Sequence, residues 1–161
     1  MHKTKNGDPL QRAVTNLEFS PHYQELFLVG YGRNDSDWDP DEPNGIVNIF
    51  SIHMPEKPEI TLLKCQSEIT ACVFHPFEPS IVIGGTYSGQ LVKWDTRTGK
   101  SFPVAKSLES TNFLIKSINI VSPQNIISVS SDGTMVDWGD DVKQPVKQLK
   151  LSSDDDDKNT M

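Results

Sequence analysis

The sequence lacks the features that mark membrane, secreted and nucleic-acid-binding proteins. It contains no apolar run long enough to span a bilayer, and its polar N-terminus does not predict a secretory signal. Only two cysteines are present, Cys65 and Cys72, which excludes a disulfide framework and favours a reducing compartment. Acidic residues outnumber basic ones by 22 to 15, without a basic cluster to neutralise phosphates. We expect a cytoplasmic protein that binds neither membranes nor nucleic acid.

Signs of catalysis and of metal binding are also missing. The four histidines are scattered without the spacing of a zinc-binding helix, and neither cysteine has a histidine partner in a recognisable motif. Residues 84–89 (GGTYSG) superficially match a phosphate loop, but Gln90 and Leu91 stand where lysine and Ser/Thr are needed. The acidic residues near Trp38 do not follow the order of a calcium-binding loop. We expect no enzyme, cofactor, metal or small-molecule substrate.

Helical periodicity is absent, and a repeat takes its place. With 11 prolines and 10 glycines, no stretch keeps apolar residues at helical spacing. A glycine followed after four residues by a large aromatic recurs at intervals of 44 residues. The three copies are Gly45 with Phe50, Gly89 with Trp94, and Gly133 with Trp138. This interval matches the blade length of about 40–45 residues in WD-type propellers.

Each repeat holds four short strand-like runs separated by turns. The turns before the second and third copies end in Ser88-Gly89 and Asp132-Gly133, which is hairpin chemistry. An acidic loop at 33–44 replaces that turn in the first copy. A β-sandwich is the competing all-β fold, but its strands have no reason to repeat in blocks of four. The sequence predicts an all-β, partial WD-repeat β-propeller of about three four-stranded blades.

The repeat boundaries divide the chain into blades and two tails. We expect three blades within residues 13–151, at about 13–64, 65–108 and 112–151. The first 12 residues and the acidic segment 152–161 are expected to be disordered. Three blades leave two sheets with an uncovered apolar face. We therefore expect either a fragment of a longer protein or a chain that completes itself against another chain.

Beyond the repeat, one segment resembles a known family. Trp94-Asp95 is the dipeptide typical of WD repeats, and residues 82–95 (VIGGTYSGQLVKWD) are similar to a blade of dynein intermediate chains. Shorter matches occur in the same order at residues 20–26, 42–45, 65–67 and 74–76. The chain departs from the family at Gln24, where proline is usual, and at Phe50, where tryptophan is usual. The resemblance covers about residues 14–140.

This resemblance implies a non-catalytic scaffold subunit. Dynein intermediate chains dock their propeller on the motor's heavy chain and bind other dynein subunits, so it implies a cytoplasmic, cytoskeleton-associated role in microtubule transport. The family's N-terminal region, which binds light chains, and its later blades have no counterpart in this sequence. A generic WD-repeat adaptor of another complex is the alternative, and an enzyme on a propeller scaffold is a third hypothesis that no residue constellation supports.

Trp38 is the candidate partner contact in the sequence. It lies in the acidic loop, where a tryptophan surrounded by carboxylates would be a good anchor for a basic partner surface. The alternative is a tryptophan packed onto its own propeller. The remaining conspicuous residues are expected to be structural: Gly45, Phe50, Gly89, Trp94, Asp95, Gly133 and Trp138.

Overall fold

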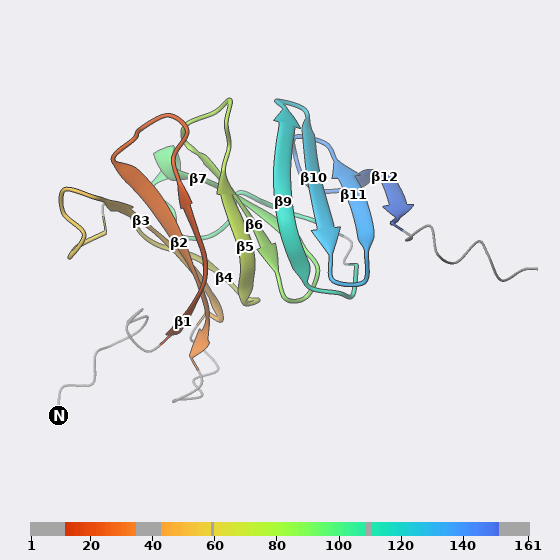
Figure 1. Ribbon diagram of the computed structural model, residues 1–161, viewed down its shortest axis with the longest axis horizontal. Helices are drawn as coiled ribbons and strands as arrows, with labels where there is room; N and C mark the ends of the chain where they lie inside the picture. Colours follow the sequence, from red (N-terminus) through yellow and green to blue (C-terminus); the bar gives the residue numbers. More distant parts are fainter. Residues whose placement is uncertain (1–11, 35–42, 59, 109–110, 152–161) are drawn as a thin grey trace, which may run out of the picture.

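The protein is built from three antiparallel β-sheets, as the repeat predicted. The computed structural model describes residues 12–34, 43–58, 60–108 and 111–151. Within these ranges twelve strands form three four-stranded sheets in chain order (Figure 1). In the described part of the chain, no helix has the length and apolar character to cross a membrane. The fold is a partial β-propeller of three blades.

The first sheet has the order β1-β2-β3-β4. Its strands are β1 (Arg12–Phe19), β2 (Leu26–Asn34), β3 (Gly45–Ser51) and β4 (Ile60–Cys65). β2 continues through Arg33 and Asn34, two residues that we expected in the acidic loop. The strand extends this far because Arg12 on β1 pairs with Asn34, and its guanidinium donates to the Gly32 carbonyl over 2.9 Å.

The second sheet repeats this order, with a much shorter outer strand. It consists of β5 (Ile69–Phe74), β6 (Ile81–Thr86), β7 (Leu91–Asp95) and β8 (Ala105–Lys106). A single-turn 3-10 helix, η2 (Thr96–Thr98), follows β7 and is capped by the Asp95 carboxylate, which accepts from Arg97 N over 3.0 Å. Asp95 therefore ends a strand and starts the next turn.

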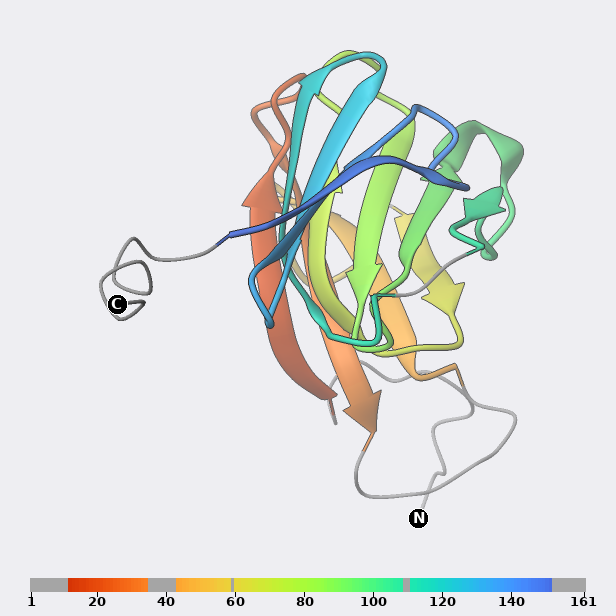
Figure 2. The same cartoon turned by 90° about the vertical axis from the view of Figure 1, so that its right-hand side faces the viewer.

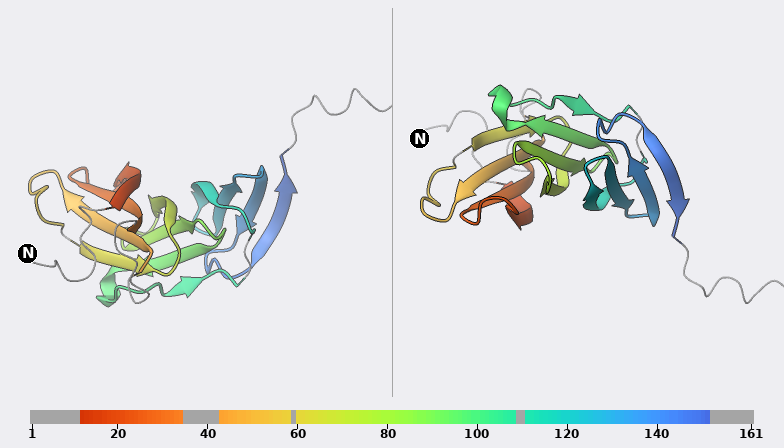
Figure 3. Two further views of the ribbon diagram at one scale, coloured as in Figure 1. Left: turned by 90° about the horizontal axis from the view of Figure 1, so that it is seen from below. Right: turned by 90° about the horizontal axis from the view of Figure 1, so that it is seen from above.

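The third sheet completes the stack. It consists of β9 (Ile115–Ser122), β10 (Asn125–Ser130), β11 (Thr134–Trp138) and β12 (Pro145–Lys150), in chain order. Seen from above and below, the three sheets splay like a fan, with the second between the other two (Figure 3). The view along the stack shows them one behind another (Figure 2).

Alternation along the strands produces two separate cores between the sheets. Between the first and second sheets, Leu28 and Ile49 pack with Trp94, all almost fully buried. Between the second and third sheets, Ile83 and Trp138 belong to a second buried cluster. Successive side chains of a strand point to opposite faces, so the middle sheet supplies residues to both cores. Its central strand β6 is accordingly buried at every position.

Polar contacts join the first strands of neighbouring sheets. Asn16 on β1 donates to the carbonyl of Cys72 on β5 over 2.8 Å, and Thr70 on β5 donates to the carbonyl of Ile115 on β9 over 2.5 Å. Both side chains donate to backbone carbonyls of the neighbouring sheet and so connect the sheets at their first strands. β1, β5 and β9 consequently stand side by side along one side of the stack (Figure 1).

Candidate protein-interaction surfaces

The aromatics of the repeat all lie on the third strand of their sheet. Trp94 and Trp138 are 0% and 1% exposed and point toward the preceding sheet. Their indole nitrogens donate to the Lys64 carbonyl over 3.2 Å and to the Ser128 hydroxyl over 2.9 Å. A buried tryptophan needs such a partner for its N–H. The two tryptophans pack between neighbouring sheets, so their side chains are not accessible to a ligand.

Phe50 occupies the same strand position in a different environment. It lies on the outer face of the first sheet, where none of the described sheets precedes it. Its ring stacks on Phe27 with centroids 5.6 Å apart, and Phe27 contacts Phe19 at the same separation. The three rings form a row across the face, and Phe19 is 54% exposed. The aromatic that would join two sheets here packs against the buried Val29, Tyr31 and Ile46 of its own sheet and stays half-buried.

The exposed part of this outer face is the apolar side of β1. Val14, Leu17 and Phe19 are each more than half exposed. We call Val14, Leu17, Phe19, Phe27 and Phe50 the first-sheet end face. Exposed apolar groups gathered on one sheet face mark a contact surface for protein, because isolated apolar residues are normal on surfaces and clusters are not.

The opposite end of the stack is more polar. In the third sheet, the positions facing away from the second sheet include Ser117, Asn119 and Asp137, together with Ile127 and Val129. The Asp137 carboxylate accepts from the Asn125 amide over 3.2 Å, so part of this face is already hydrogen-bonded. The two ends of the stack therefore differ in chemistry, and the first-sheet end face is the stronger candidate for an apolar contact.

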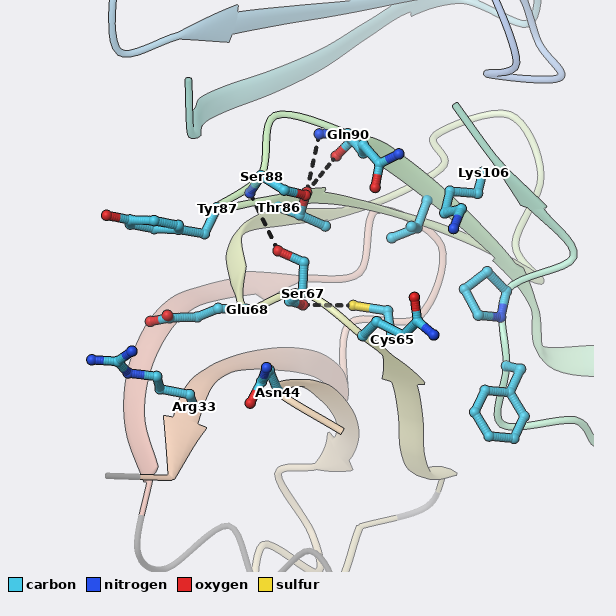
Figure 4. Close-up of a pocket in the computed structure, with 14 residues that line it drawn as sticks. Arg33, Asn44, Cys65, Ser67, Glu68, Thr86, Tyr87, Ser88, Gln90 and Lys106 are labelled. Atoms are coloured by element: carbon cyan, nitrogen blue, oxygen red, sulfur yellow. Dashed lines mark hydrogen bonds between the residues drawn. The ribbon is translucent and has the colours of Figure 1, made fainter. Parts of the chain in front are cut away.

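A groove of about 850 Å³ opens between the first and second sheets, at the end where β4 turns into β5 (Figure 4). Arg33 and Glu68 line it on one side, and Lys106 lines it on the other. Phe102 also belongs to the lining. Two of its hydroxyl groups are already engaged: Ser67 accepts from Ser88 N over 3.2 Å, and Thr86 accepts from Gln90 N over 3.0 Å. The mixed lining suits a polar peptide segment better than a small apolar ligand.

The cysteine in this groove is not a nucleophile. Cys65 is buried, and its thiol donates to the Ser67 carbonyl over 2.9 Å. Burial raises the pKa of the Cys65 thiol to about 12, so the reactive thiolate is scarce at neutral pH. Burial raises the pKa of Cys72 to about 12 as well. Both cysteines act as small core residues.

The glycine-rich segment that superficially matches a phosphate loop serves packing. Gly84 and Gly85 lie in β6, where a Cβ on Gly84 would come within 2.7 Å of the Trp94 ring and one on Gly85 within 2.5 Å of Ile115. Gly89 follows in the hairpin turn with φ of 83°. The missing side chain of Gly85 lets β9 of the third sheet approach closely, and that of Gly84 leaves room for the Trp94 ring of its own sheet.

Histidine also has a structural use in the described residues. His75 is 2% exposed, and its Nδ1 accepts from Phe77 N and Glu78 N over 3.2 and 3.1 Å. Burial lowers the pKa of His75, which keeps the ring neutral. Across the described ranges, no group of three or more His, Cys, Asp or Glu residues is arranged to hold a metal ion.

The remaining repeat glycines differ in what they do. Gly133 turns the β10–β11 hairpin with φ of 82°, matching Gly89. Gly45 begins β3, where an added Cβ would collide with the Ser67 carbonyl. Trp38 lies outside the described residues. One residue that the repeat did not single out is Glu18, and its signal was a charged side chain between the apolar Leu17 and Phe19 of a strand.

The fold defines a class, which is a set of stacked blades of a partial β-propeller. The chain is similar to the "Cytoplasmic dynein 1 intermediate chain" of Drosophila melanogaster, with 31% identity over an alignment of 147 residues that covers 87% of this chain. The match covers 22% of that relative, so the chain spans about a fifth of its length. No protein-family model matches the chain.

A solved structure supports the fold alone. The crystal structure of the computationally designed Ika8 protein matches with a TM-score of 0.61 and 22% identity. The match covers 86% of this chain and 36% of the designed one. The sequence similarity, and not this structural match, supports a relationship to dynein intermediate chains, as the resemblance at residues 82–95 predicted.

Proposed function

We propose that the chain is part of a non-catalytic scaffold subunit of the dynein intermediate-chain type, whose blades dock on the dynein heavy chain in microtubule-based transport. The observation that carries this proposal is the 31% identity to a dynein intermediate chain across nearly the whole chain. The three-blade fold and its exposed apolar end face agree with a binding role. A cytoplasmic, cytoskeleton-associated location belongs to the same proposal.

Trp38 belongs to the proposal as a partner contact. Loops at the ends of propeller strands project from a rigid scaffold, which is where binding residues concentrate. The loop that holds Trp38 follows Asn34, the last residue of β2, and this end of the sheet also borders the groove lined by Arg33.

The experiment is a direct binding assay with purified dynein components. The tagged chain, immobilised, is exposed to a purified dynein heavy-chain tail fragment, and retention is compared with that of an unrelated propeller. We expect saturable retention that Trp38→Ala weakens about tenfold, the effect of a hot-spot tryptophan. Tyr23→Ala is the matched control, because Tyr23 is a 49% exposed aromatic in the turn at the other end of β1 and β2.

The outcomes separate the hypotheses. If the heavy chain is not retained while affinity purification from cells recovers other partners in fixed proportion, the chain is a generic WD-repeat adaptor and the dynein assignment is wrong. If neither Trp38→Ala nor Tyr23→Ala changes the retention, the dynein role stands. In that case Trp38 is not part of the contact with the heavy chain.

A further inference from the structure

A second, smaller cavity lies where the first strands of the three sheets meet. Its volume is about 420 Å³, within the range of ligand pockets. Its walls come from β1, β5 and β9 and from the turns that follow β1 and β5, and are mostly apolar. The lining residues are Glu18, Pro21, Val73, Phe74, Pro76, Ile118, Asn119 and Ile120.

Glu18 is the single ionisable group of this lining. It pairs with Leu28 across β1 and β2, so its side chain points to the face that packs on the second sheet. Within the described residues, the Glu18 carboxylate has no hydrogen bond or ion pair. The ion pairs there join Arg97 to Asp95 and Lys150 to Asp132. A half-buried carboxylate without a counter-charge is destabilising unless something else supplies the charge.

The electrostatics of the site agree with this geometry. Burial raises the pKa of Glu18 from 4.5 to about 7, and no cation contributes to the shift. The titratable group that couples to it is the Cys72 thiol, which stays protonated because its own pKa is about 12. The side chain remains half-buried, so the carboxylate is within reach from solvent.

We propose that this cavity receives a lysine side chain of a partner protein, whose ammonium group pairs with Glu18. The apolar walls at Val73, Ile118 and Ile120 suit the four-carbon stem of lysine, and the carboxylate suits its charged end. The net charge of −7 attracts a basic partner over longer distances. The inference rests on the proposed binding role of the chain and names the chemistry of the partner.

The test uses two small probes that differ in one charge. Nα-acetyl-lysine N-methylamide carries the ammonium group, and its Nε-acetylated form has the same stem without the charge. The carboxyl of Glu18 is titrated by NMR on the ¹³C-labelled full chain with each probe. We expect the charged probe to lower the pKa of Glu18 by about one unit at saturation, as an opposite charge in contact does, and the acetylated probe to leave it unchanged.

Two variants make the result specific to the cavity. Glu18→Gln keeps the shape and removes the charge, so it should weaken binding of the lysine probe about tenfold. Glu56→Gln, in the exposed β3–β4 connection, should bind as the unchanged chain does. Thermal unfolding of both variants establishes that they are folded.

Binding of the lysine probe to the variants is followed by the NMR chemical shifts of the cavity residues Val73 and Ile118. Equal binding of the two probes, or lysine-probe binding that Glu18→Gln leaves unweakened, would overturn the inference. So would the absence of any saturable shift in the folded chain. None of these results bears on the proposed binding to the heavy chain, because the retention assay does not use the lysine probes. Loss of heavy-chain retention with an intact lysine effect would instead contradict only the dynein assignment.

Discussion

Among single residues, the neighbouring sheet decides what an aromatic on the third strand contributes. Trp94 has the first sheet against its ring and a carbonyl for its indole N–H, so it is completely buried. Phe50 takes the same strand position, but none of the described sheets precedes it, and it stays half-buried against Phe27. The same sequence pattern therefore contributes differently to the free energy of unfolding at the two positions.

This difference predicts unequal losses of stability. Trp94→Ala should lower the free energy of unfolding by about 3–5 kcal/mol, because it opens a large cavity between two sheets. Phe50→Ala should cost roughly half as much, since part of the ring is already in contact with water. Urea unfolding measures both values. Phe102→Ala is the control, expected within about 0.5 kcal/mol because Phe102 is 68% exposed.

Equal losses for Trp94→Ala and Phe50→Ala would contradict this account, because they would mean that the outer face of the first sheet is as fully covered as the sheet interface. The spacing of 44 residues placed both aromatics on third strands. It carried no information about their burial, because burial depends on which sheet stands opposite.

At the scale of strands and turns, local chemistry was the reliable guide. Tyr87-Ser88-Gly89 and Ser131-Asp132-Gly133 read as hairpin turns, and both glycines adopt positive φ. The Asp132 carboxylate adds local support by accepting from Thr134 N over 3.1 Å. Such turns are set by a few adjacent residues, so the sequence is sufficient to predict them.

Two turn glycines, Gly99 and Gly89, should differ in the stability that is lost when each is replaced by alanine. Gly99→Ala should cost about 1 kcal/mol from backbone strain alone, since Gly99 has φ of 65° and an added Cβ would meet only open space. Gly89→Ala should cost clearly more, because the added Cβ would also come within 2.5 Å of Thr111 Oγ1. Thermal unfolding of the two variants gives the comparison. A Gly89→Ala variant no less stable than Gly99→Ala would show that Thr111 moves away without cost.

Strand length was the least predictable property of the elements. β2 extends to Asn34 because Arg12 donates to the Gly32 and Asn44 carbonyls and holds the strand end in place. β8 shrinks to two residues beside Val92 and Lys93. The lengths of both strands depend on contacts between residues that are far apart in the chain. Local strand propensity therefore does not predict where these strands end.

Considering the whole molecule, the two ends of the stack determine how the chain behaves in solution. The first-sheet end face exposes Val14, Leu17 and Phe19, while the other end mixes apolar residues with Ser117, Asn119 and Asp137. In a propeller the faces of neighbouring sheets cover one another. Exposed sheet faces of this kind are contact surfaces or association sites.

The chain alone should therefore self-associate. Light scattering coupled to size-exclusion chromatography should show a mass above 18.0 kDa that rises with concentration. A double change of Leu17→Ser and Phe19→Ser should reduce this association, because it removes two of the most exposed apolar groups of the face. Val146→Ser, on the outer strand of the third sheet, is the matched control for an exposed apolar residue elsewhere. A single monomeric mass at all concentrations would contradict the prediction.

The sequence by itself determined the class of fold, because a 44-residue period, turn glycines and short aliphatic runs are local properties of the chain. It also pointed to dynein intermediate chains through residues 82–95. The tertiary structure decided which faces are covered, because Phe50 and Trp94 hold the same strand position and only Trp94 has a described sheet opposite its ring. It alone brought Glu18 together with Val73 and Ile118, since residues about 55 and 100 positions away meet only when three sheets stack.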